Sequence, residues 1–239
     1  MALPFGLIHR ASDLSREECD LVRKLLESQG YRELAAAHAF GAGLPLAPTL
    51  DDKLLLADEI LEELGHFEAA AALHAELECG DLLLAIDGRI RVVPIPSSWL
   101  EVAIVRFLFD RAEKFQLREY RSSRFTPLAR MVERILPDEE SHGAAGEALL
   151  RELCCAERGN TALAQACFLK WLRISLMSFG RPGSARGLRA VALGLKARDS
   201  ADVMREFLCD LLPTMSACGL RFPPERAIEL DLPDGIFPE

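Results

Sequence analysis

The chain has 239 residues, half of them hydrophobic, and a formal net charge of −9. This length and apolar content fit one compact domain, while the negative charge without a Lys/Arg cluster disfavours a nucleic-acid backbone as partner. A cytoplasmic protein with reduced thiols is expected, because the sequence holds seven scattered cysteines without a CxxC motif, no signal-peptide pattern and no window with the roughly 20 apolar residues of a membrane span.

Two long helices are predicted at the start of the chain. The first begins after Ser12 or Ser15 and reaches about Phe40. Gly30 lies inside this helix and is expected to mark a bend or a break. A loop then leads to the second helix, over residues 49–79, whose first turn carries acids that suit the positive end of the helix dipole.

The middle of the chain predicts a loop followed by two further helices. Residues 81–96 are expected to form a loop, with or without a short hairpin, rather than a helix, because they include β-branched residues, two prolines and an Asp-Gly pair. Helices over 99–120 and 125–158 follow. Pro127 suits the first turn of the latter, whereas Pro137 is expected to kink its interior.

The C-terminal third is also helical in pattern. Three helices are predicted, at residues 161–179, 184–197 and 201–215. The proline-rich tail from Gly219 onward is expected to be an extended strap. The predicted fold class is therefore all-α, in a single domain with a core bundle over about 13–158 and C-terminal helices and tail over 159–239.

Two of the five histidines close the pattern Glu-x-x-His, at residues 63–66 and 139–142. At helical pitch, residues three apart lie on one face, so each motif directs a carboxylate and an imidazole to the same point. An acid precedes each motif in the preceding helix: Glu33 lies 30 positions before the first motif, and Asp110 lies 29 before the second. The predicted metal ligands are Glu33, Glu63, His66, Asp110, Glu139 and His142.

This is the ligand set of ferritin-like four-helix bundles that hold two iron ions between carboxylates and imidazoles. Carboxylates offset the repulsion between two cations, and manganese–iron or di-manganese centres use similar ligands. The alternative is a set of amphipathic helices that carry acids by chance. The apolar neighbours of Glu33 and Asp110 argue against it, because a carboxylate is costly to bury unless it is paired or bound to metal.

Several neighbours of the six residues have two readings. Glu62 and Asp138 each lie four residues before a ligand histidine, and they are either acceptors that orient an imidazole across the bundle or solvated surface acids. Four apolar side chains are expected to exclude water and admit an organic group, unless they are ordinary core: Phe40, Leu64, Phe107 and Phe109.

The sequence resembles the oxygenase subunits of the phenylacetyl-CoA epoxidase system, the phenylacetic acid catabolic proteins. The resemblance covers about Cys19 to Pro223, with a chain shorter than typical catalytic subunits and Pro137 as an unusual insertion. The stretches that carry it are Tyr31-Arg-Glu-Leu-Ala, Glu-Glu-Leu-Gly-His-Phe at 62–67, Trp99-Leu-Glu-Val-Ala, Phe109-Asp-Arg-Ala, Asp-Glu-Glu-Ser-His at 138–142 and Gly-Leu-Arg-Phe-Pro at 219–223.

The resemblance implies a di-iron monooxygenase subunit that inserts one oxygen atom into an aromatic acyl-CoA. Its electrons would come from a separate iron–sulfur flavin reductase, and a homologous subunit or a second copy would be its partner. All six ligand positions are filled, which favours a metal-bearing subunit over the family's scaffold subunit with a degenerate site. A non-catalytic binding subunit on the same fold remains the alternative, and ferritin-type iron storage is disfavoured because the chain extends well beyond four helices.

Overall fold

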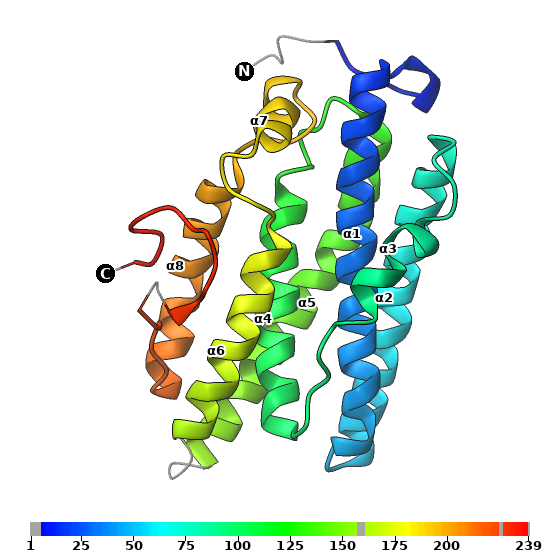
Figure 1. The fold of residues 1–239 in the computed structure, drawn as a ribbon. Coiled ribbons are helices and arrows are strands. Elements are labelled where there is room, and N and C mark those ends of the chain that lie inside the picture. The colour runs from blue at the N-terminus through cyan, green and yellow to red at the C-terminus, as the bar shows by residue number, and fades with distance from the viewer. Residues whose placement is uncertain (1–5, 157–160, 225–226, 239) are drawn as a thin grey trace.

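The computed structural model describes residues 6–156, 161–224 and 227–238, and it shows an all-α protein over these ranges. Four long helices form a ferritin-like antiparallel bundle (Figure 1). These helices are α1 (Arg16–Gly43), α2 (Leu50–Glu76), α4 (Trp99–Arg118) and α5 (Thr126–Ala156). The described residues contain no β-strand, apart from one isolated bridge between Ile8 and Phe125. The predicted fold class is confirmed.

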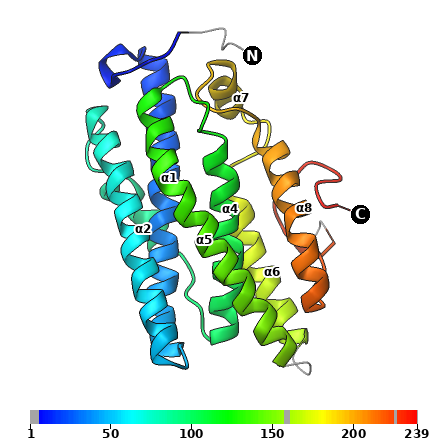
Figure 2. The same ribbon diagram turned by 180° about the vertical axis from the view of Figure 1, so that it is seen from behind.

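The bundle is made of two helical hairpins, α1 with α2 and α4 with α5. Packing within each hairpin is far more extensive than packing between the two hairpins. Figure 2 shows the two hairpins side by side from behind. Each hairpin therefore behaves as one packed unit, and the interior between the units is where side chains from all four helices meet.

The first helix starts at the predicted cap, and the break expected within it is absent. Ser15 and Glu18 form a capping box, in which each side chain satisfies a backbone amide at the start of α1. The predicted break at Gly30 is wrong, since α1 continues through this residue, while the alternative of a bend there stays a prediction. A Cβ atom at Gly30 would lie 2.7 Å from Leu82 Cδ2, so the glycine allows a neighbouring segment to pack closely.

That segment is a helix, α3 (Leu82–Ile90), and the loop or hairpin expected over residues 81–96 is wrong in its first half. Leu82, Ile86 and Ile90 recur every four residues and are all buried, in a core cluster shared with α1. Asp81 caps the helix by accepting from two backbone amides. Burial on one helical face has overridden the β-propensity of the isoleucines.

The C-terminal helices cover the α4 side of the bundle. They are α6 (Thr161–Ser178), α7 (Ala185–Ala192) and α8 (Ser200–Cys218), with α6 packed on α4 and α8 on α4 and α5 (Figure 1). The helix predicted over 184–197 ends early, because Gly194 takes a left-handed conformation with φ of 67°.

Two predictions about α5 concern Pro137 and the C-terminal end of the helix. Pro137 lies inside α5, which continues through it without a break, so the kink stays a prediction. The predicted end of that helix near residue 158 lies outside the described residues. As expected, residues 220–224 and 227–238 of the tail contain no named helix or strand, and Ile228 and Ile236 are buried against the core. None of the described helices is both long and apolar enough to cross a lipid bilayer.

Candidate metal centre

All four bundle helices bring buried ionisable side chains to the interior between the two hairpins. Glu33 comes from α1 and Asp110 from α4, while α2 and α5 each supply one Glu-x-x-His motif. The exposed fraction is 0% for each of the three glutamates and highest, at 7%, for His66. Because an isolated buried charge is strongly unfavourable, such a concentration requires compensating partners.

Four of the six predicted ligands converge tightly. Glu33, Glu63, His66 and Glu139 each offer a ligand atom, and these four atoms all lie within 4.8 Å of one another. Nδ1 of His66 is 3.1 Å from Glu139 Oε1 and 3.5 Å from Glu33 Oε2. Neither approach is aligned as a hydrogen bond, so the atoms surround a common point without satisfying one another.

The other two predicted ligands lie beside this group. Nδ1 of His142 is 3.4 Å from Glu63 Oε1. Asp110 is only 1% exposed, and burial and the negative charge of Glu139 raise its pKa well above the usual value. The structure thus brings all six residues into one buried region, with four of them in closest contact.

The outer nitrogen of each imidazole contacts an acid from the opposite hairpin. Nε2 of His66 on α2 is 3.1 Å from Asp138 Oδ2 on α5, and Nε2 of His142 on α5 is 2.6 Å from Glu62 Oε2 on α2. An imidazole that donates from Nε2 to a carboxylate keeps the lone pair of Nδ1 free for a metal ion. Of the two readings of Glu62 and Asp138, the structure therefore supports the orienting role.

Burial and the mutual charges of these side chains shift their pKa values strongly. Burial, followed by the charges of Glu139 and Glu33, raises the pKa of Glu63 well above its usual value. Burial alone would lower the pKa of His66, but its contacts with Glu139 and Glu33 raise that pKa to about 11. A metal ion would displace protons from these groups and supply the positive charge that the acids lack.

The unsatisfied atoms give an independent test of whether a metal fits. The buried side-chain atoms of the centre that have no hydrogen-bond partner are Glu33 Oε2, both carboxylate oxygens of Glu63 and of Glu139, Asp110 Oδ2, and Nδ1 of His66 and of His142. Carboxylate oxygen and imidazole nitrogen together suit iron and manganese. The buried group can therefore bind metal.

The comparison with known proteins agrees with this geometry. A family profile described as phenylacetic acid catabolic protein matches residues 7–239. The chain belongs to this family. It is similar to one of the subunits of the 1,2-phenylacetyl-CoA epoxidase of Escherichia coli (strain K12), at 24% identity over 222 residues, which cover 85% of this chain and 70% of its relative. The resemblance found in the sequence motifs is thereby confirmed.

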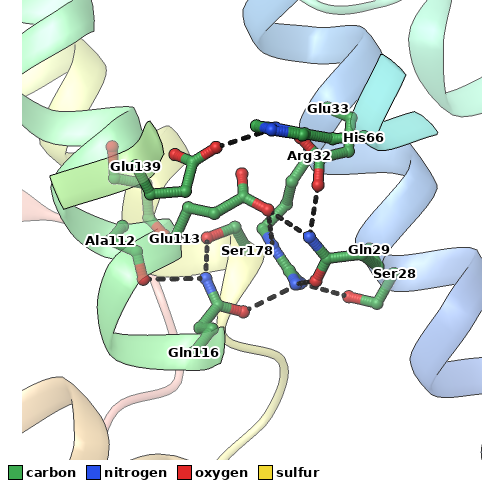
Figure 3. Close-up of polar contacts among 11 residues, drawn as sticks. Ser28, Gln29, Arg32, Glu33, His66, Ala112, Glu113, Gln116, Glu139 and Ser178 are labelled. Carbon is green, nitrogen blue, oxygen red and sulfur yellow. Dashed lines mark hydrogen bonds and ion pairs between the residues drawn. The ribbon is translucent and has the colours of Figure 1, made fainter. Parts of the chain in front are cut away.

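In this phenylacetic acid catabolic protein, a polar network extends from the centre between α1 and α4 (Figure 3). The amide of Gln29 donates to both Glu33 and Glu113. Arg32 in turn donates to the amide oxygens of Gln29 and Gln116, and its Nε is 3.5 Å from Glu113 Oε1. Burial and the charge of Glu33 raise the pKa of Glu113 well above normal.

A buried ion pair lies on the other side of the centre. Arg106 on α4 donates to Glu59 on α2, and the two side chains are 1% and 3% exposed. Each of them stands one helical turn before a predicted ligand, Glu59 before Glu63 and Arg106 before Asp110. Sequence reasoning missed both this pair and the Gln29–Glu113 network. Polar residues one turn from a ligand, on the same buried face, were the available signal.

The walls around the centre only partly match the expected apolar set. Phe40 and Phe107 are fully buried in the core, and Phe109 lines a small inner cavity of about 20 Å³ with Tyr31 and Glu113. Leu64 is 40% exposed, so its expected shielding role is wrong. The inner cavity has room for about one water molecule, and an organic group would enter only after its walls move.

Proposed function

We propose that this chain is the metal-bearing oxygenase subunit of a di-iron monooxygenase that acts on an aromatic acyl-CoA. The proposal includes two iron ions, with manganese as the alternative metal, held by Glu33, Glu63, His66, Asp110, Glu139 and His142. It also includes a homologous subunit or second copy as partner, a separate electron-donating reductase, and a cytoplasmic location. When bound, the metal pair would supply the chemistry that activates oxygen.

One observation carries the proposal. Both imidazoles present Nδ1 toward buried, unsatisfied carboxylates, while an acid from the opposite hairpin contacts each Nε2. A structural ion-pair network would place Lys or Arg side chains among these acids. Here the cations nearest the centre, Arg32 and Arg106, contact Glu113 and Glu59 instead. The arrangement leaves the predicted ligands available for metal.

The protein's own residues would have three tasks in this function. Glu62 and Asp138 hold a proton at each Nε2, which fixes the rotation of the imidazoles. Gln29 holds Glu33 in position through its amide hydrogen bond. Phe109 and Tyr31 form the wall through which an organic substrate would approach, and they exclude bulk water from the interior.

Metal content and substrate oxidation test the proposal. After anaerobic loading with ferrous iron, the wild-type chain should retain about two ions, whereas Glu63→Ala and His142→Ala should retain far fewer with unchanged circular dichroism. Glu76→Ala is the matched control, because Glu76 is an exposed acid at the end of the same helix. With a reductase and phenylacetyl-CoA, the loaded wild type should incorporate one atom of labelled dioxygen into the thioester. Full iron retention in both ligand variants would refute the assignment, and a metal-free wild type that binds a homologous subunit would identify a non-catalytic partner instead.

A further inference from the structure

Two cysteines lie together at the open end of the first hairpin. The helices α1 and α2 are antiparallel and are joined by the turn that follows Gly43, so the start of α1 lies beside the end of α2 (Figure 1). Cys19 is in the first turn of α1, and Cys79 is in the connection between α2 and α3. The pair therefore stands at the end of the hairpin that no turn closes.

The thiols of this pair converge on one backbone atom. Sγ of Cys19 is 3.9 Å from the carbonyl oxygen of Leu77, and Sγ of Cys79 is 3.3 Å from the same oxygen. The two thiols also interact directly with each other, and burial followed by the charge of Cys79 raises the pKa of Cys19. The two sulfur atoms are therefore close neighbours, although they are 60 positions apart in the sequence.

The backbone around Cys79 has an unusual shape. Glu78 and Gly80, on either side of the cysteine, both have positive φ, of 56° and 83°. Glycine adopts this left-handed conformation readily, whereas a glutamate does so at a cost in energy. The helix that follows, α3, packs on α1 and holds the far end of the connection. The unfavourable turn at Glu78 thus persists where it places Cys79 beside α1, and such persistent strain often marks a functional position.

A small oxidant can reach both thiols. Each of the two cysteines is a free thiol and only partly buried, at the edge of the apolar cluster shared by α1, α2 and α3. Deeply buried cysteines are chemically inert, whereas an accessible thiol with a second thiol beside it oxidises reversibly. The raised pKa keeps the Cys19 thiol protonated at neutral pH, which makes the pair stable in its reduced form until an oxidant is present.

We propose that Cys19 and Cys79 form a reversible disulfide when the protein meets hydrogen peroxide. One sulfur attacks the peroxide as a thiolate, the O–O bond breaks, and a sulfenic acid forms with release of water. The second thiol attacks this sulfur, the S–O bond breaks, and another water leaves as the S–S bond forms. In balance, two thiols lose two electrons and two protons, and one peroxide becomes two water molecules. A dithiol reductant reverses the change.

The disulfide would close about 60 residues into a covalent ring. The ring contains three of the predicted metal ligands, Glu33, Glu63 and His66. Closing a ring of this size restricts the unfolded chain and so favours the folded hairpin. The bond itself would form about 21 Å along α1 from Glu33, at the helical rise per residue. Oxidation is therefore expected to stabilise the hairpin without rearranging the ligands, and the inference does not depend on the proposed function.

Peptide mapping of the full-length protein tests the proposal. After reduction, removal of the reductant and treatment with hydrogen peroxide, non-reducing digestion of the wild type should give a peptide that joins Cys19 to Cys79 and disappears with dithiothreitol. The melting temperature of the oxidised form should be higher by about 5–10 °C. Cys19→Ser and Cys79→Ser should each lack the linked peptide and the shift. Cys209→Ser is the matched control and should behave as the wild type, because Cys209 is an exposed cysteine of α8.

Three outcomes would overturn the proposal. The first is that Cys19 and Cys79 of the folded wild type both stay open to alkylation under peroxide treatment that oxidises Cys209. The second is that either of them is found joined to a different cysteine or to a second chain. The third is that Cys209→Ser loses the melting shift as fully as the two variants of the pair do. If a serine variant fails to fold, the linked peptide of the wild type decides the question, because its detection needs no variant.

Discussion

Replacing Glu62 by alanine removes the acceptor that holds Nε2 of His142, while the imidazole itself stays in place. The contact measures 2.6 Å, a short distance for a charge-assisted hydrogen bond. Removing such a partner of a metal-bound histidine typically weakens metal affinity roughly 10- to 100-fold. Glu62 is about half exposed, with 48% of its side-chain surface accessible, so water can partly replace it. We therefore expect a loss of about tenfold, at the lower end of this range.

The matching change on the other hairpin should have a smaller effect. Asp138 contacts Nε2 of His66 at 3.1 Å, a longer and weaker contact at nearly the same exposure. Among the described residues, Glu62 contacts the imidazole of His142 and Asp138 that of His66. Glu62→Ala and Asp138→Ala should therefore each weaken one bound ion and leave the other largely unchanged. Glu62→Gln should retain most of the affinity, because its amide oxygen still accepts from Nε2.

Anaerobic titration with ferrous iron against a competing chelator measures both affinities. Glu68→Ala serves as the control, since Glu68 is an acid of α2 for which no contact with either imidazole is seen. Wild-type affinity in both Glu62→Ala and Asp138→Ala, or an equal loss in Glu68→Ala, would refute the claim that these acids orient the ligands.

Two further predictions concern the stability of the metal-free chain. In α5, Gly146→Ala should destabilise by about 1–3 kcal/mol in urea unfolding, because its Cβ would lie 2.8 Å from the backbone nitrogen of Phe107. At Gly143 the added Cβ would have no atom nearer than 3.8 Å, so Gly143→Ala should instead stabilise the folded state by up to about 1 kcal/mol. A change of stability in the same direction for both variants would contradict the packing argument. Stability should also fall as pH rises from about 6.5 to about 11, by up to ~1.4 kcal/mol per pH unit, because His66 keeps its proton in the folded state and loses it on unfolding. Metal-loaded protein should lack this slope, and a flat profile without metal would argue against a protonated centre.

The sequence was sufficient to place the ligand candidates because their pattern is local. A Glu-x-x-His spacing fixes which two side chains share a helical face, and the repeated distance to a preceding acid reflects the length of an antiparallel hairpin. The structure brings Glu33, Glu63, His66 and Glu139 together as that pattern indicates. Their role as metal ligands stays a prediction.

Features that depend on contacts between distant segments were missed. The isoleucines of α3 looked like strand residues, since only the neighbouring α1 makes their helical face a buried one. No local pattern indicated a role for Arg32, because its partner Glu113 stands far along the chain on α4. Gly30 was expected to mark a bend or a break, because the sequence alone does not distinguish a glycine that permits close packing from one that interrupts a helix.

The two hairpins of the bundle are held together at the centre by the groups that the metal would use. Packing between α2 and α5 is sparse compared with packing inside each hairpin. The contacts of His142 with Glu62 and of His66 with Asp138 connect α2 and α5. Each contact therefore both orients a ligand and joins the hairpins. A metal bound by side chains of both hairpins would add further links where the bundle is least packed, so metal binding should also stabilise the folded state.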